Sequence, residues 1–307
     1  MYTLLSTLLF FSTLVHLSNC WGHLGHRTVA YLAQKQLSPA GASYVTRLLR
    51  SEDISKASLW ADEYRGRREG RFTSDWHFID ANDDPPRRCN VEYNRDCRPR
   101  TGCVVSAITN MTTRANDPSL PPKQHYEALK FLLHFIGDIH QPLHTEKLQK
   151  GGNGIHVLFD GEEVDLHKVW DTRIPDKHRD NEGSGIPAEK SHASAWADQL
   201  ISVGTSEDWL KCTDITRAED CALEWANEAN DYICSYVLKN DVEGEELGGE
   251  YYDGAVPIVD ELVAKAGFRL AAWIEGLAAE RAAMMERGVV FEGPWATEQE
   301  VMGAEEL

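Results

Sequence analysis

The sequence has few positive charges for its length. Its 307 residues include 31 Lys and Arg against 49 Asp and Glu, which gives a formal charge of -18. That balance argues against a protein that holds nucleic acid through a broadly basic surface. The basic residues are unevenly spread, and nine Arg with no Lys lie between Arg65 and Arg100. The planar guanidinium suits phosphate oxygens, although a solvated surface stretch explains such a run equally well.

Charged side chains are absent from the first twenty residues, which contain no Lys, Arg, Asp or Glu. The apolar run from Leu4 to Leu17 is too short to span a bilayer comfortably and stands at the N-terminus. Residues 1–20 are therefore predicted to be a cleaved secretory signal. No later stretch is long and apolar enough for a transmembrane helix, so we expect a secreted, extracellular protein with no membrane attachment after signal removal.

Cysteine usage agrees with an oxidising compartment. Cys20 falls in the signal, and the six that remain are Cys89, Cys97, Cys103, Cys212, Cys221 and Cys234. Six cysteines predict three disulfides, and spacing alone leaves 15 pairings open. The single glycosylation acceptor triplet, Asn110-Met111-Thr112, makes Asn110 a candidate site.

Strand-forming patterns are nearly absent. The one clear β signal is a small hairpin, 155–159 and 163–166, around Asp160-Gly161. Residues 75–80 are expected to be extended or irregular, and 82–100 a long polar loop. Helices are predicted at 28–33, 39–50, 57–65, 104–114, 126–139, 187–203, 216–238 and 257–283, with a further helical piece from residue 167. We find no repeat or linker, so the prediction is all-α: one mainly helical domain, 21–287, followed by an acidic flexible tail, 288–307.

The most informative stretch is the helix predicted at 126–139, which is apolar almost all round and therefore buried. His134 and Asp138 stand four residues apart, on one side of it. A buried carboxylate needs compensation. Pro142 ends the helix, so His144 follows on non-helical backbone and is free to turn back toward the same site. One such pair, taken alone, is more often a core hydrogen bond.

Other residues change that interpretation. The spacing of His134 and Asp138 recurs in His167 and Asp171, while Asp62 precedes His77 by 15 residues. His26 stands in a flexible region near the predicted mature N-terminus. Histidines and carboxylates, with no cysteine among them, are the ligands of zinc in hydrolytic sites, which keep positions open for water and substrate.

Together these motifs resemble the fungal and plant single-strand-specific zinc nucleases, the type I nucleases. The resemblance covers Trp21 to about Ala279, and the motifs occur in the family's order. They are Trp21 at the predicted mature N-terminus, Ala57-Ser58-Leu59-Trp60-Ala61-Asp62-x2-Arg65, Trp76-His77-Phe78-Ile79-Asp80, His134-x3-Asp138-Ile139-His140-Gln141-Pro142-Leu143-His144, Gly151-Gly152-Asn153 and Leu166-His167-x2-Trp170-Asp171.

The resemblance implies an all-helical fold with three Zn2+, related to that of zinc-dependent phospholipases C. Asp62, His77, His134 and Asp138 would hold one zinc. Asp138 would bridge to a second, held by His26 and by the α-amino and carbonyl groups of Trp21. His144, His167 and Asp171 would hold the third. The resemblance also implies disulfides Cys97–Cys103 and Cys89–Cys234, which leaves Cys212 and Cys221 for the third.

The activity implied is endonucleolytic hydrolysis of single-stranded DNA and RNA to 5′-phosphorylated products, with 3′-nucleotidase action on mononucleotides, by a monomeric enzyme. Zinc would activate water for attack on phosphorus. Asp80 would orient the nucleophile and Arg65 would stabilise charge on phosphate. Phe78 would stack a base, and Asn153 would contact substrate. One departure is Asp165, where the family commonly has Asn; if it faces the substrate, its charge would weaken binding.

Two alternatives remain at this point. Bacterial zinc-dependent phospholipases C share the trinuclear site and the tryptophan ligand, so metal ligands alone do not separate a lipid diesterase from a nuclease. The His-Gln-Pro-Leu-His run and the Gly-Gly-Asn turn favour the nuclease. The second is a non-catalytic metal-binding protein with a degenerate site, and the complete ligand set argues against it.

Overall fold

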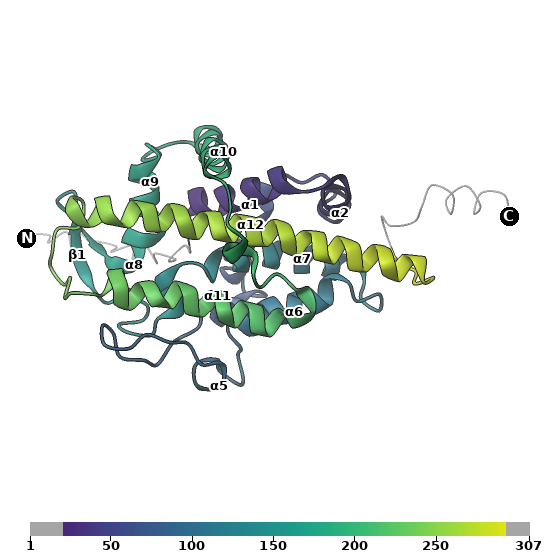
Figure 1. Ribbon diagram of the computed structural model, residues 1–307, viewed down its shortest axis with the longest axis horizontal. Coiled ribbons are helices and arrows are strands. Elements are labelled where there is room, and N and C mark those ends of the chain that lie inside the picture. The colour runs from purple at the N-terminus through teal and green to yellow at the C-terminus, as the bar shows by residue number, and fades with distance from the viewer. Residues whose placement is uncertain (1–20, 293–307) are drawn as a thin grey trace, which may run out of the picture.

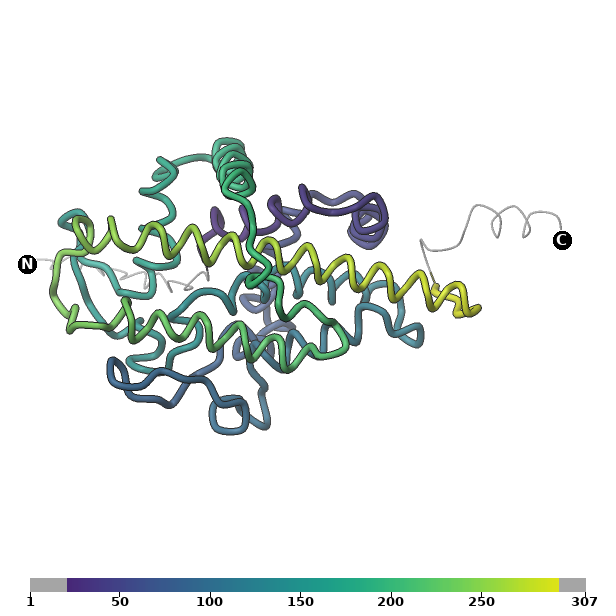
Figure 2. The backbone as a smooth tube through the Cα atoms, in the orientation of Figure 1, coloured from purple at the N-terminus to yellow at the C-terminus, as the bar shows by residue number. Residues whose placement is uncertain are grey.

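The computed structural model describes residues 21–292, and the predicted signal and most of the predicted tail lie outside the described residues. Helices dominate this part of the chain (Figures 1 and 2). The α-helices are α1 (His23–Gln36), α2 (Pro39–Leu49), α3 (Ile54–Ala57), α4 (Trp60–Arg65), α5 (Tyr93–Asp96), α6 (Val104–Ala115), α7 (Pro122–Asp138), α8 (Leu166–Lys168), α9 (Ile174–His178), α10 (Ile186–Val203), α11 (Ala218–Tyr232) and α12 (Glu250–Glu286). Tighter or wider turns connect them: η1 (Arg71–His77), η2 (Pro142–Thr145), η3 (Val169–Arg173), η4 (Glu207–Leu210), η5 (Ile215–Arg217) and η6 (Ile233–Val237).

The longest helix, α12, has 37 residues and runs along the molecule beside α11 (Figure 1). Side chains join these two helices, because the indole rings of Trp225 and Trp273 meet edge to face at 5.1 Å and Arg269 pairs with Glu228 at 2.8 Å. Helix α1 packs against both α12 and α10, and α6 packs against α7. The mainly helical fold predicted from the sequence is confirmed.

Helix α7 forms the centre of the core. Every residue from Ala128 to Asp138 is buried, including the polar His134 and Asp138. An apolar surface on all sides of the helix requires neighbours on all sides, and α1, α2, α4, α6 and α12 supply them. The two polar side chains are therefore held inside the protein, where their partners must come from other segments.

The hairpin is the one sheet within residues 21–292. Its strands β1 (His156–Phe159) and β2 (Glu162–Asp165) are antiparallel, with Val157 opposite Val164. Asp160 and Gly161 both have positive φ, as the two central residues of a tight hairpin turn require. The hairpin predicted around these two residues is confirmed.

Several segments differ from the predictions. Helix α1 begins at His23, five residues before the predicted start at residue 28, so His26 lies on a helix and not in a flexible region, and the predicted loop 82–100 contains the short helix α5. Residues 75–77, expected to be extended or irregular, belong to the 3-10 turn η1, in which Thr73 Oγ1 donates to Gly70 O at 2.7 Å. Helix α12 begins at Glu250, seven residues before the predicted start at Pro257, so the proline lies inside the helix. Tertiary contacts explain the extension, because Tyr251 accepts a hydrogen bond from Trp170 Nε1 at 3.0 Å and donates to a backbone carbonyl.

Three disulfides connect the six cysteines of residues 21–292, in the pairing that the resemblance implied. Cys97–Cys103 closes a short loop, Cys212–Cys221 fastens the segment before α11, and Cys89–Cys234 ties the loop after Asp80 to η6. A long polar loop with little apolar area to bury gains order from such cross-links. No helix among the described residues has the length and hydrophobicity needed to cross a membrane.

Candidate metal centre and substrate pocket

Four side chains from three separate segments converge at the C-terminal half of α7. Asp62 comes from α4, His77 from the end of η1, and His134 and Asp138 from α7 itself. His77 Nδ1 lies 3.0 Å from Asp138 Oδ2, 3.1 Å from His134 Nε2 and 3.7 Å from Asp62 Oδ1. His134 Nε2 lies 3.2 Å from Asp138 Oδ2 and 3.6 Å from Asp62 Oδ1. These four donor atoms thus surround one point.

The second carboxylate oxygen of Asp138 faces a different neighbour. Asp138 Oδ1 lies 3.2 Å from His26 Nε2 on α1, while Oδ2 belongs to the first group. Trp21, at the start of the described chain, is fully buried, and Gly22 N donates to Asp171 O at 2.6 Å. The start of the domain is therefore folded into the same region as the donor groups.

A third group consists of His144 from η2, His167 from α8 and Asp171 from η3. His144 Nε2 lies 3.6 Å from Asp171 Oδ1, and His167 Nε2 lies 3.0 Å from Asp171 Oδ2. The ligand-type atoms lie within 4.8 Å of one another in each of three sets: Asp62, His77 and His134; His26, His134 and Asp138; and His144, His167 and Asp171. The structure thus brings together every His and Asp that the sequence singled out as a metal ligand.

Backbone carbonyls select the tautomer of three of the histidines. His134 Nδ1 lies 2.7 Å from Ser58 O, His144 Nδ1 lies 2.9 Å from His77 O, and His167 Nδ1 lies 2.6 Å from Gly151 O. A carbonyl oxygen only accepts, so each Nδ1 carries the proton and each Nε2 presents a lone pair to its group. This orientation of a ligating His by a carbonyl is typical of metal sites.

The spacing of the donor atoms fits zinc. Two ligands at 2.0–2.1 Å from one ion in tetrahedral geometry are about 3.3 Å apart, and the first group has five such separations of 3.0–3.7 Å. Buried polar atoms point the same way: Asp138 Oδ1, Asp171 Oδ2 and His144 Nε2 face atoms of the donor groups themselves and have no hydrogen-bond partner outside them among the described residues. A cation is the partner that nitrogen lone pairs and carboxylate oxygens can share.

The pKa shifts favour the metal-binding forms of His77, Asp138 and Asp171. Burial alone would lower the pKa of His134 and His167, but the neighbouring carboxylates of Asp138 and Asp171 raise it, so a metal would displace a proton from these two imidazoles. Burial, reinforced by Arg65, lowers the pKa of His77 to about 4, so its imidazole is neutral at physiological pH. Burial alone would raise the pKa of the Asp138 carboxyl, but the attraction of His134 and hydrogen bonds from the surrounding histidines hold it well below its usual range. Asp171 is likewise kept ionised by His167 and His144 against the effect of burial. Neutral imidazoles and ionised carboxylates are the forms that bind metal.

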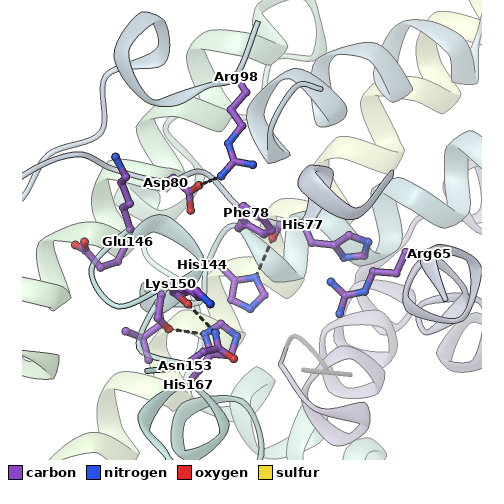
Figure 3. Close-up of a pocket in the computed structure, with 13 residues that line it drawn as sticks. Arg65, His77, Phe78, Asp80, Arg98, His144, Glu146, Lys150, Asn153 and His167 are labelled. Atoms are coloured by element: carbon purple, nitrogen blue, oxygen red, sulfur yellow. Dashed lines mark hydrogen bonds and ion pairs between the residues drawn. The ribbon is translucent and has the colours of Figure 1, made fainter. Parts of the chain in front are cut away.

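A pocket of about 600 Å³ opens over this centre (Figure 3). His77, His144 and His167 lie in its wall, together with the sequence-predicted Arg65, Phe78, Asp80 and Asn153. Its other charged residues are Arg98, Lys147, Lys150 and Glu146. Four Arg and Lys against two acids make the pocket locally basic although the chain is strongly acidic, which suits an anionic substrate.

Arg65 and Asp80 lie on different sides of the pocket (Figure 3). Arg65 pairs with Asp62 Oδ1 at 2.8 Å, one helical turn away. Asp80 Oδ2 pairs with Arg98 at 2.5 Å. Burial raises the pKa of the Asp80 carboxyl, and Arg98 beside it opposes that shift. Asn153 donates through Nδ2 to Lys150 O at 2.7 Å, which fixes the orientation of its amide at the pocket.

Several site residues were not predicted from the sequence. Gln141 Nε2 donates to Asp171 Oδ1 at 2.5 Å, and Gln141 Oε1 accepts from Leu143 N, so this side chain positions the carboxylate of the third group. Gln141 lies within the conspicuous motif from His134 to His144, but nothing in the motif indicates that its side chain contacts Asp171. Arg98 and Lys150 reach the pocket from loops, where no periodic pattern marks them.

Asp165, the departure from the family pattern, has a local role. Its carboxylate accepts a hydrogen bond from Lys168 N at 2.8 Å and caps the short helix α8 that carries His167. It is not among the residues that line the pocket. The Asp165 side chain therefore does not face this pocket, and we do not expect its charge to weaken substrate binding there.

Comparisons with known proteins agree with the site. A family model described as S1/P1 Nuclease matches residues 21–279. The chain is 40% identical over 277 residues to Nuclease S1 of Aspergillus oryzae, covering 87% of this chain and 95% of the relative. It is 41% identical over 267 residues to Nuclease P1 of Penicillium citrinum, covering 83% and 96%. Endonuclease 3 of Arabidopsis thaliana is 33% identical over 280 residues, covering 86% and 91%. The chain therefore belongs to the S1/P1 nuclease family and is a hydrolase of nucleic-acid phosphodiester bonds.

Proposed function

We propose that the protein is a secreted, zinc-dependent endonuclease that cleaves single-stranded DNA and RNA to 5′-phosphorylated products and removes the phosphate from 3′-mononucleotides. The observation that carries the proposal is that donor residues of the first and third groups, His77, His144 and His167, lie in the wall of a basic pocket that also contains an aromatic ring. Anionic phosphate, an activated water and an unpaired base would each find a suitable partner there.

The donor groups would hold three Zn2+. Asp62, His77 and His134 serve the first ion, with Oδ2 of Asp138. His26 and Oδ1 of Asp138 would serve the second, together with the amino terminus that signal removal gives Trp21, and the group of His144 would serve the third. When bound, zinc supplies Lewis acidity toward phosphate oxygens and lowers the pKa of water toward neutrality.

The remaining pocket residues bind and orient the substrate. Arg65, beside the first group, stabilises negative charge on the phosphate through its fixed guanidinium. Asp80 accepts a hydrogen bond from the attacking water and so orients it. Phe78, half-buried at the pocket, stacks an unpaired base, and Asn153 contacts the nucleotide through its amide. Stacking of this kind requires a base that has left its duplex, which is the physical basis for single-strand preference.

The same proposal includes the organisation of the whole chain. Residues 1–20 form a cleaved signal, 21–287 the nuclease domain and 288–307 an acidic tail. Three disulfides suit an oxidising compartment. Asn110 carries a glycan, and its exposure on α6 supports that assignment. The mature protein is a monomer.

The test compares four substrates before and after metal removal. The mature protein should cleave denatured DNA and RNA far faster than duplex DNA, and phosphatidylcholine should be a poor substrate. Exhaustive chelation should abolish hydrolysis, and added Zn2+ should restore it, with metal content measured in each sample. Full activity in protein shown to contain no zinc would refute the metal dependence. Faster hydrolysis of phosphatidylcholine than of denatured DNA would instead assign a lipid phosphodiesterase.

A further inference from the structure

A second cluster of oxygen atoms adjoins the pocket, outside the three donor groups described above, and shares Glu146 with the pocket wall. It consists of Asp83 in the loop after Asp80, Glu146 just after η2, and Asn230 on α11. The Asp83 side chain contacts both Glu146 and Asn230. Glu146 is 3% exposed, Asn230 is fully buried and Asp83 is half-buried, so two carboxyl groups and an amide meet at the edge of the protein interior.

One polar atom of each of the three side chains forms a hydrogen bond with a backbone group of another residue. Asp83 Oδ2 accepts from Asn90 N at 3.1 Å, and Glu146 Oε1 accepts from Leu148 N at 2.6 Å. Asn230 Nδ2 donates to Thr145 O at 3.1 Å, which orients the amide. The other oxygens, Asp83 Oδ1, Glu146 Oε2 and Asn230 Oδ1, are buried and have no hydrogen-bond partner outside the cluster among residues 21–292; within it, Asp83 interacts with Glu146 and Asn230.

No positive side chain in the described part of the chain forms an ion pair with Asp83 or Glu146. The basic side chain that acts on Asp83, Arg95, is already engaged, because it donates to both oxygens of Asp96, to Glu92 and to Asn90 O. Two buried carboxylates without a counter-charge are strongly unfavourable. The cluster therefore lacks a positive partner.

We propose that Asp83, Glu146 and Asn230 form a calcium-binding site separate from the zinc centre. Ca2+ takes oxygen ligands from carboxylates and amide or backbone carbonyls, and it tolerates irregular geometry. Zinc prefers nitrogen and sulfur, and Mg2+ retains several of its waters, so neither matches a buried, all-oxygen cluster as well. Two carboxylates balance the charge of one divalent ion.

The position of this site gives it a structural role near the pocket. Ile79 N donates to His144 O at 2.8 Å, and Lys147 N donates to Ala81 O at 3.3 Å, so the segment with Asp80 pairs with the segment that follows His144. A bound Ca2+ would fasten both segments to α11. Glu146 itself lines the pocket, so the ion would steady the pocket wall.

A proton shared between Glu146 and Asp83 is the alternative to a bound calcium ion. Burial, together with the nearby Asp83, raises the pKa of Glu146 to about 8, so a protonated Glu146 would donate to Asp83 at neutral pH. The two arrangements predict different responses to calcium. A shared proton needs no calcium, and Gln at position 146 would replace the protonated acid with little change.

The experiment uses the mature protein loaded with zinc and dialysed free of calcium, at pH 7.5. Equilibrium dialysis against CaCl2 should show one Ca2+ per chain. At a free concentration one hundred times Kd, calcium should raise Tm by about 5–10 °C. The same concentration of MgCl2 controls for ionic strength and should have a much smaller effect. Zinc content, measured in parallel, should stay constant.

The variants Asp83→Asn and Glu146→Gln should each weaken calcium binding at least about tenfold and reduce the rise in Tm. Asp84→Asn is the matched control, because Asp84 is adjacent but exposed and pairs with Arg87 at 2.9 Å; its calcium response should equal that of the wild type. The proposal is wrong if the wild-type protein binds no calcium, or if both site variants keep the full response. If a variant fails to fold, the number of Ca2+ ions bound per wild-type chain still tests the proposal.

Discussion

Replacing Asp138 by Ala should weaken the binding of two zinc ions, whereas His167→Ala should weaken one. The reason is the division of Asp138 between two groups: Oδ2 faces His77 and His134, and Oδ1 faces His26. His167 contributes a single nitrogen to the third group. The number of weakened ions is therefore a direct readout of the bridging arrangement.

The expected magnitude follows from the loss of a ligand. Removing even an outer partner of a metal ligand costs about 10–100-fold in affinity, so we take about 100-fold as the minimum for a ligand itself. That factor is about 2.7 kcal/mol per ion, or about 5.5 kcal/mol for two. In a domain of this size 1 kcal/mol shifts Tm by about 2–4 °C. The zinc-dependent part of Tm should thus fall by about 11–22 °C for Asp138→Ala and about 5–11 °C for His167→Ala.

The assay is a zinc titration against a competing chelator, with Tm recorded in zinc-buffered and in fully chelated solution. The difference between the two Tm values isolates the metal contribution from the small cavity that Ala leaves at either position. His156→Ala, a change at an exposed histidine on the hairpin, is the control and should match the wild type. If both ligand variants weaken the same number of zinc ions, Asp138 does not bridge.

Other expectations concern the pocket and the start of the chain. Asp80→Asn should keep zinc content near that of the wild type and lower kcat on the order of a hundredfold; full activity would show that Asp80 does not orient the nucleophile. Arg65→Ala should lower the rate with the fold intact, and Arg65→Lys should recover only part of it, since Lys lacks the planar fork. One extra residue before Trp21 should loosen the zinc shared with His26, because a peptide nitrogen cannot replace an amine; three tightly bound zinc ions in the extended form would exclude that ligand. In metal-free protein, the lowered pKa of His77, about 4 against an ordinary 6.5, means that the unfolded chain binds more protons between these values. The contribution of His77 to the free energy of unfolding should therefore decrease as pH falls from 6.5 toward 4. Urea titrations of wild type and His77→Gln should show a difference between the two proteins that changes over this pH range.

The sequence by itself determined the features that depend on local periodicity. An apolar pattern on all sides marked α7 as the buried centre, and the i,i+4 spacing put His134 and Asp138 on one side of it, as the structure shows. The turn at Asp160 and Gly161 identified the hairpin. These signals are readable because the residues that interact are close in sequence, so the backbone period alone places them.

The family resemblance supplied most predictions that concern residues far apart in sequence, including the candidate ligands from distant segments and the disulfide pairing. Periodicity could not have joined Asp62 and His77 to His134, because their meeting depends on how α4, η1 and α7 pack. The early start of α12, before Pro257, also depends on contacts of Tyr251 with a distant tryptophan. Tertiary packing overrides a local helix-start signal in that case.

Only the tertiary structure decided which oxygen of Asp138 faces which histidine, and that Arg98 and Lys150 reach the pocket from loops. It also brought Asp83, Glu146 and Asn230 together from positions far apart in the chain. Such arrangements have no sequence period, since each arises where separately folded segments meet. Their chemistry comes from the burial and the mutual distances that packing imposes, and these are properties of the folded chain.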